Sequence, residues 1–133
     1  MTLDALWTAE FQVRGGWTNG GVVVVENERV FGGDRQYWYA GRLSLNQDGE
    51  SISGHLKVVH YHGDRTAAFG DAGPVFSLEI QGTVLSPTAI SGVLKRPGLG
   101  NLAFRLTRRE EISRSAHNIR SDVPLGSQFS KSS

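Results

Sequence analysis

The sequence predicts an all-β protein: an eight-stranded antiparallel up-and-down barrel followed by a disordered C-terminal tail. Three observations support this prediction. Short segments alternate apolar and polar side chains with a period of two, the pattern of strands with one buried face. Glycine, proline, asparagine and aspartate separate these segments at regular intervals, as turns do. No stretch shows the periodicity of an amphipathic helix.

The N-terminal segments predict a strand, a glycine-rich turn and a hairpin. Residues 7–14 alternate without a break. Glycines at 15–16 and in the segment 19–21 predict a turn. The four valines at 22–25 are β-branched and favour a second strand. After a tight connection, residues 29–31 are expected to pair back as a short third strand.

The middle of the chain predicts a second hairpin and one long loop. Residues 36–45 resume the alternation, and residues 46–49 end in Asp-Gly, a strong hairpin signal. Residues 50–62 predict a long fifth strand. The segment 63–74 is long for a connection in a compact domain, so we expect it to bind a partner or to cap the barrel.

Three further strands complete the predicted barrel. Residues 75–84 alternate again, and a Ser-Pro-Thr turn leads into a strand at 89–95. A Pro-Gly turn within 96–100 then precedes the last strand at 102–106. Sequential hairpins favour an up-and-down barrel, because closing the sheet leaves no exposed strand edge.

The inward-facing positions of this barrel contain four glycines, Gly41, Gly54, Gly82 and Gly92. Either these glycines accommodate large neighbours and allow the sheet to bend, or they leave an open interior. A barrel of eight strands can be filled by side chains or can hold one small ligand. The side chains predicted to line such a cavity are Trp7, Phe11, Tyr37, Tyr39, Leu56, Phe76, Leu78 and Phe104.

Composition predicts one folded domain at residues 1–110 and a tail at 111–133. The tail is rich in serine and has no periodicity, so it cannot bury enough apolar surface to fold. The formal net charge of +1 argues against electrostatic capture of nucleic acid or of a membrane surface. The chain has no cysteine and its N-terminus shows no secretory signal, which together favour a cytoplasmic location.

Few residues suggest catalysis, and we expect neither an enzyme nor a bound cofactor. His60 and His62 have the spacing of two metal ligands on one strand face, but no third ligand is evident, so we predict no metal site. The Gly32-Gly33-Asp34 turn lacks the following helix of a phosphate-binding loop. No nucleophile elbow is present.

Two aromatic side chains, Trp38 and Tyr61, fall on positions predicted to face outward. Exposed aromatics on a β surface are typical of an oligomer interface or a partner site. Stacking on single-stranded nucleic acid is another possibility, but it requires a basic groove that the balanced charge does not favour.

The order of these motifs resembles the GrlR family, negative regulators of bacterial type III secretion genes. The resemblance spans about residues 3–109. Its most specific element is the Gly-Gly-Asp turn that ends at Asp34, followed by aromatic-x-aromatic-x-Gly at residues 37–41. The segment 6–11 and the valine run that follows Gly21 also match.

The resemblance implies a lipocalin-like barrel that forms a homodimer and has an apolar interior suited to a lipid-like molecule. It also implies a protein that sequesters a transcriptional activator through an acidic surface loop. The corresponding loop here, residues 46–50, has only Asp48 and Glu50 as acidic residues. Two hypotheses follow: a non-enzymatic regulator that acts by protein–protein contact, or a carrier or sensor of a small apolar ligand.

Overall fold

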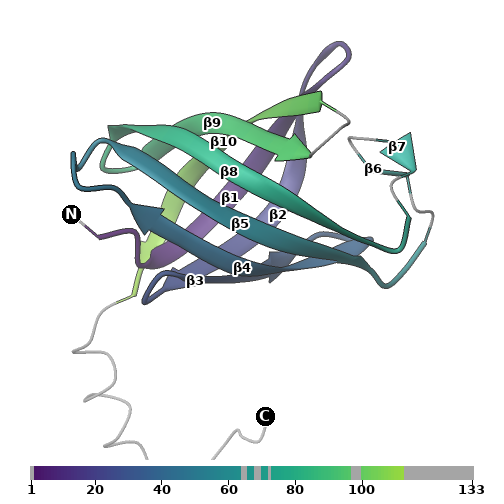
Figure 1. The fold of residues 1–133 in the computed structure, drawn as a ribbon, viewed down its shortest axis with the longest axis horizontal. Helices are drawn as coiled ribbons and strands as arrows, with labels where there is room; N and C mark the ends of the chain where they lie inside the picture. Colours follow the sequence, from purple (N-terminus) through teal and green to yellow (C-terminus); the bar gives the residue numbers. More distant parts are fainter. Residues whose placement is uncertain (1, 64–65, 68–69, 72, 97–99, 113–133) are drawn as a thin grey trace, which may run out of the picture.

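The computed structural model describes residues 2–63, 66–67, 70–71, 73–96 and 100–112. Eight strands form a closed barrel in the order β1-β10-β9-β8-β5-β4-β3-β2 (Figure 1), and β6 and β7 pair separately. The predicted eight-stranded antiparallel barrel is therefore confirmed. The strands are β1 (Ala5–Val13), β2 (Gly16–Glu26), β3 (Arg29–Gly33), β4 (Tyr37–Leu45), β5 (Ser51–His60), β6 (Thr66–Ala67), β7 (Gly70–Asp71), β8 (Val75–Ser86), β9 (Ala89–Arg96) and β10 (Gly100–Glu111).

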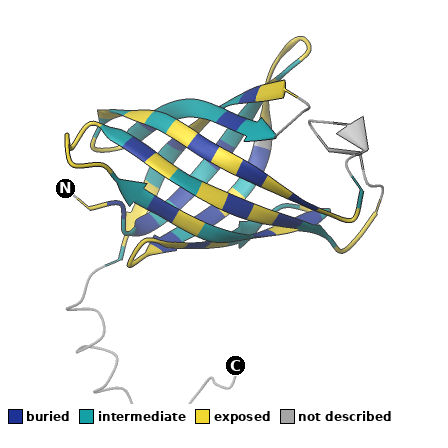
Figure 2. Cartoon of the chain, in the orientation of Figure 1, coloured by how far each residue is buried: buried dark blue, intermediate teal, exposed yellow. Residues whose placement is uncertain are grey.

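The alternating sequence pattern becomes an alternating burial pattern. In β8, Phe76, Leu78 and Ile80 are buried while the residues between them are exposed. Figure 2 shows the same buried and exposed bands across the strands of the barrel. Because successive side chains of a strand point to opposite faces, each strand contributes every second residue to one shared core.

The second strand is longer than predicted, and the expected turn at 19–21 is wrong. β2 begins at Gly16 and pairs with β1 from Val13↔Gly16 up to Ala5↔Val25. The register shifts between Ala9 and Glu10, so that Gly20 is the extra residue of a β-bulge. The glycines that suggested a turn instead let the strand bend where the Phe11 ring packs against Gly20.

Other boundaries differ from the predicted ones. β5 ends at His60, two residues earlier than expected, and β10 runs from Gly100 to Glu111, past the expected domain boundary at 110. The predicted loop 63–74 contains β6 and β7, and part of it lies outside the described residues. The predicted disorder of the tail also lies outside the described residues, from 113 onward.

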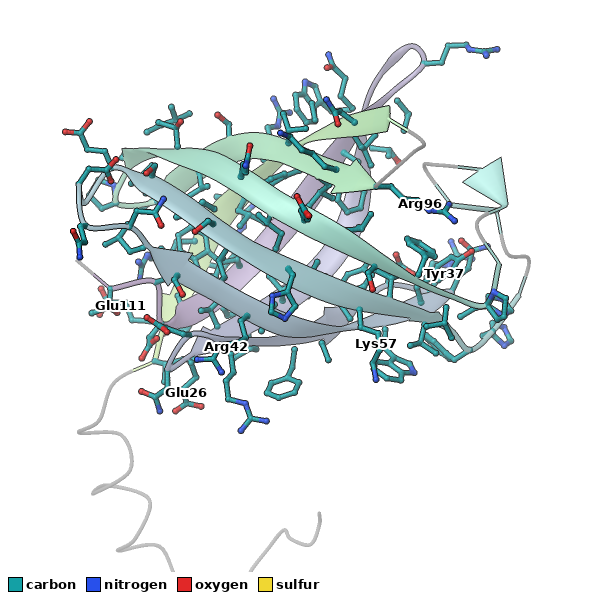
Figure 3. All side chains as sticks on the ribbon, viewed as in Figure 1. Glu26, Tyr37, Arg42, Lys57, Arg96 and Glu111 are labelled. Carbon is teal, nitrogen blue, oxygen red and sulfur yellow. The ribbon has the colours of Figure 1, made fainter. Side chains whose placement is uncertain are left out.

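The turns divide between the two ends of the barrel (Figure 1). The N-terminal segment, the end of β10 and the turns β2–β3, β4–β5 and β8–β9 share one end, which we call the Trp7 end. The turns β1–β2 and β3–β4 lie at the other, which we call the Asp34 end. Figure 3 shows Glu26, Arg42 and Glu111 toward the first end and Tyr37 and Arg96 toward the second.

The inward glycines mark places where neighbouring strands approach closely. Gly82 on β8 lies opposite Gly92 on β9. A Cβ at Gly92 would overlap the carbonyl oxygen of Gln81, and one at Gly54 would overlap that of Arg42. These glycines therefore allow the barrel to coil tightly, and the cavity described below lies elsewhere in the interior.

Candidate functional site

The Trp7 end of the barrel is closed by packed side chains. Trp7 is fully buried, and its indole N–H donates to the carbonyl oxygen of Leu3 at 2.9 Å. The Arg108 guanidinium lies 4.8 Å from the indole centroid and donates to the carbonyl oxygens of Asp4 and Thr2. The other large side chains that are almost completely buried are Val25, Ile52 and Ile90.

The rest of the interior contains a cavity of about 370 Å³. Its walls are mostly aliphatic and aromatic, and its polar lining residues, Thr18, Asp34 and Gln36, belong to the Asp34 end. Thr18 is exposed, so the lining reaches the protein surface there. Its main apolar lining residues are Phe11, Val23, Tyr37, Tyr39, Leu56, Val58, Phe76, Leu78, Ile80, Leu94, Leu102, Phe104 and Leu106.

Seven of the eight side chains proposed from the sequence line this cavity: Phe11, Tyr37, Tyr39, Leu56, Phe76, Leu78 and Phe104. Trp7 does not line it, because this side chain is part of the packing that closes the opposite end. The strand phases placed all eight residues inward, but phase alone does not tell how far along the barrel axis a side chain lies.

The sequence reasoning missed Asp34, which was interpreted only as part of a turn. Asp34 Oδ1 accepts hydrogen bonds from the backbone N–H groups of Gln36 and Tyr37, both at 2.8 Å. Asp34 Oδ2 accepts one from the Tyr39 hydroxyl. These bonds hold the carboxylate at the edge of the cavity. The Gly-Gly-Asp motif, followed by aromatic residues in an inward phase, was the available signal.

The Tyr39 hydroxyl connects β4, β2 and the β3–β4 turn at the cavity edge. Besides Asp34, it lies 2.9 Å from the carbonyl oxygen of Gly20, which the bulge in β2 turns toward it. Burial, and then the hydrogen bond to the Asp34 carboxylate, raise the pKa of Tyr39 well above its ordinary value. The phenol therefore stays protonated at neutral pH and acts as a donor.

The two aromatic residues predicted to face outward have different surroundings. Trp38 is half-exposed on the outer wall of β4, with the Lys57 ammonium 5.4 Å from its ring centroid. Tyr61 lies past the end of β5, where its hydroxyl donates to the Asp34 carbonyl oxygen at 2.6 Å. Tyr61 is exposed but is fixed to the β3–β4 turn. The outer wall also exposes Val22, Phe31 and Val75.

The loop 46–50 lies at the Trp7 end, far from the cavity edge (Figure 1). Asp48 accepts hydrogen bonds from the backbone N–H groups of Glu50 and Ser51 and from the Ser51 hydroxyl. These bonds lower the pKa of Asp48. Asp48 therefore stabilises the turn itself, whereas the Glu50 side chain is exposed.

The remaining candidate motifs have structural partners. The backbone N–H groups beyond Gly33 donate to Asp34, so they are not presented as a phosphate cradle. His60 is paired with the Gly63 carbonyl oxygen at 2.7 Å, and His62 lies beyond the strand. Within the described part of the chain, no three metal-ligating side chains gather. Among the same residues, no helix has the length and apolar character needed to cross a bilayer.

No protein-family model matches this chain, and no curated protein matches it significantly. The resemblance to the GrlR family therefore stays a prediction.

Proposed function

We propose that this protein binds a small apolar molecule inside the barrel and serves as a carrier or sensor of it. The observation that supports this proposal is the cavity of about 370 Å³ with apolar walls. Small-molecule sites have volumes of about 300–1,000 Å³ and combine apolar walls with a few polar groups. The cavity is also more than twice as large as an engineered cavity of about 150 Å³ that binds benzene.

The distribution of side chains favours an elongated or bulky apolar ligand with one polar end. Aromatic rings form part of the wall, and Tyr37 and Phe76 meet edge to face with centroids 6.1 Å apart. Because the Trp7 end is packed, we expect the polar end of the ligand to lie at Asp34. Water in the apolar part would find few hydrogen-bonding partners, so its replacement by a ligand is favourable.

A matched pair of valine substitutions tests the cavity. Val58 is buried and lines it, whereas the next residue, Val59, is on the opposite face of β5. Val58→Phe should weaken binding of the neutral fluorescent dye N-phenyl-1-naphthylamine by about tenfold or more, because the ring fills the ligand volume. Val59→Phe should leave binding unchanged. Equal binding by both variants, with circular dichroism showing that both fold, would contradict the proposal.

Native mass spectrometry offers an independent test. Protein purified from its host should carry a co-purifying apolar molecule that organic extraction removes. The same protein with Val58→Phe should carry less of that molecule. A preparation that neither carries a ligand nor binds the dye would count against the interior as a binding site.

A second candidate is a cytoplasmic regulator that acts by protein–protein contact, with a transcriptional activator as its partner. The exposed Glu50 side chain on a turn fixed by Asp48 supports this candidate, as does the resemblance to type III secretion regulators. Pull-down from the host lysate should recover one defined partner. Glu50→Ala should reduce recovery, whereas Glu26→Ala on β2 should not. Equal recovery with both variants would exclude the loop as the contact.

The outer wall supports a homodimer as part of this second candidate. Half-exposed Trp38 and Phe31 lie on adjacent strands, β4 and β3, where apolar surface is available for a second subunit. Light scattering after size exclusion should give twice the monomer mass of 14.5 kDa. Trp38→Glu should produce monomers. A wild-type protein that is monomeric at high concentration would contradict this interface.

A further inference from the structure

Among the described residues that line the cavity, Asp34 is the only charged one. The other polar lining residues, such as Thr18 and Gln36, are neutral, and the walls beyond them are apolar. Of the charged side chains in this part of the chain, a bound molecule that fills the interior would therefore meet Asp34, at one end of the cavity. This inference rests on the proposed function, because it concerns the chemical class of the ligand in the same cavity.

Within the described ranges, the Asp34 carboxylate is held in place by hydrogen bonds and has no cationic partner. A carboxylate has about four positions at which it accepts hydrogen bonds. Gln36, Tyr37 and Tyr39 occupy three of them, two on Oδ1 and one on Oδ2. Among the described residues, the ion pairs are Arg42–Glu28 and Arg105–Glu10, and neither involves Asp34. One acceptor position on Oδ2 remains for a ligand.

A basic side chain, Arg96, lies at the same end of the barrel. The Arg96 guanidinium lies 4.9 Å from the centroid of the Phe76 ring. Arg96 itself does not line the cavity, whereas Asp34 does. Figure 3 shows Arg96 extending from the end of β9. A head group at the end of the apolar chamber thus meets the Asp34 carboxylate directly.

We propose that the cavity selects amphiphiles whose head group is neutral or cationic and donates a hydrogen bond, and that it discriminates against anionic ones. An alcohol or an ammonium group can donate to Asp34 Oδ2 while its chain occupies the apolar chamber. A carboxylate head group at the same place has no proton to donate and is repelled by the Asp34 charge. The repulsion is strong because the cavity wall has a low local dielectric constant.

Three ligands with the same chain test this selectivity: decylamine, decanol and decanoate, each displacing N-phenyl-1-naphthylamine from the wild-type protein below its micelle concentration. Decanoate should bind about tenfold or more weakly than decanol, and decylamine at least as tightly as decanol. Decanoate binding as tightly as decanol, or more tightly, would overturn the inference.

Two substitutions that remove one negative charge each serve as a matched pair. Asp34→Asn keeps an oxygen that can accept from the two backbone N–H groups but removes the charge, so the difference between decanol and decanoate should shrink to about threefold or less. Glu50→Gln removes a charge at the opposite end and should leave the difference unchanged. An unchanged difference in folded Asp34→Asn would overturn the assignment to Asp34.

The outcomes separate this inference from the proposed function. If no ligand displaces the dye because the dye does not bind, the proposed function fails. If all three ligands bind with equal affinity, the cavity is a binding site and only the selectivity inference is wrong. If Asp34→Asn does not fold, the order of the three ligand affinities on the wild-type protein still decides whether the cavity discriminates against anionic head groups.

Discussion

Removing the Tyr39 hydroxyl should destabilise the protein more than removing the Tyr61 hydroxyl. Tyr39→Phe keeps the ring but removes the hydroxyl, whose single proton is donated to Asp34 Oδ2 with the Gly20 carbonyl oxygen also within reach. Hydrogen bonds to charged groups contribute about 1.5–3 kcal/mol. For a domain of this size that corresponds to a decrease in Tm of roughly 6–12 °C, at about 4 °C per kcal/mol.

Tyr61→Phe is the matched control, because its hydroxyl also contacts Asp34. That bond joins neutral groups and lies at an exposed position, so its loss should cost about 0.5 kcal/mol. Urea denaturation followed by tryptophan fluorescence measures both variants. If Tyr39→Phe is no less stable than Tyr61→Phe, the hydroxyl at the cavity edge does not stabilise the barrel as we argue.

The loss of stability caused by Tyr39→Phe should decrease at high pH. The pKa of Tyr39 is raised above its ordinary value of 10.0 in the folded protein. Above pH 10 the unfolded chain releases this proton while the folded protein retains it, so the free energy of unfolding falls with a slope of at most about 1.4 kcal/mol per pH unit. Below pH 10 the Tyr39 phenol makes its full contribution to the free energy of unfolding. The stability difference between wild type and Tyr39→Phe should therefore narrow as the pH rises from 10 to 11. A stability difference that stays constant over this pH range would contradict a Tyr39 phenol that remains protonated in the folded protein.

Three further predictions concern the framework. Gly92→Ala should lower the free energy of unfolding in urea by about 1–3 kcal/mol, because its Cβ would overlap a carbonyl oxygen of β8; an unchanged midpoint would refute the close approach. Arg108→Met should lower the Tm, because the guanidinium stacks on Trp7 and donates to three carbonyl oxygens, and one hydrogen bond to a charged group contributes about 1.5–3 kcal/mol at most. An unchanged Tm would contradict this role. Asp48 should titrate below 3.8 in a carboxyl NMR experiment, and a midpoint above that value would contradict its three hydrogen bonds.

Alternation along the chain was sufficient to predict the strands and their buried faces, and the sequential hairpins predicted the barrel. Trp7, Tyr37 and Leu56 were placed inward from a period of two, and all three are buried. This works because a strand has only two faces, so a repeated apolar position identifies the buried one without knowledge of its neighbours. The Asp-Gly turn at 48–49 was equally local, since its geometry depends on adjacent residues.

Position along the barrel axis could not be predicted in this way. Trp7 and Phe11 share one face of β1, yet one is packed into the closed end and the other lines the cavity. Gly20 was expected in a turn, but its neighbours pair with β1 and leave Gly20 as the extra residue of a bulge, with its carbonyl oxygen 2.9 Å from the Tyr39 hydroxyl. Each of these outcomes depends on strands that are distant in sequence.

By itself, therefore, the sequence determined the fold class, the inward faces and the apolar character of the interior. Only the tertiary structure decided that the interior is closed at Trp7 and hollow toward Asp34, and that a carboxylate from a turn forms the charged edge of the cavity. The physical reason is that local periodicity specifies the face on which a side chain lies, whereas an empty volume and its charge arise from how side chains of all eight strands pack together.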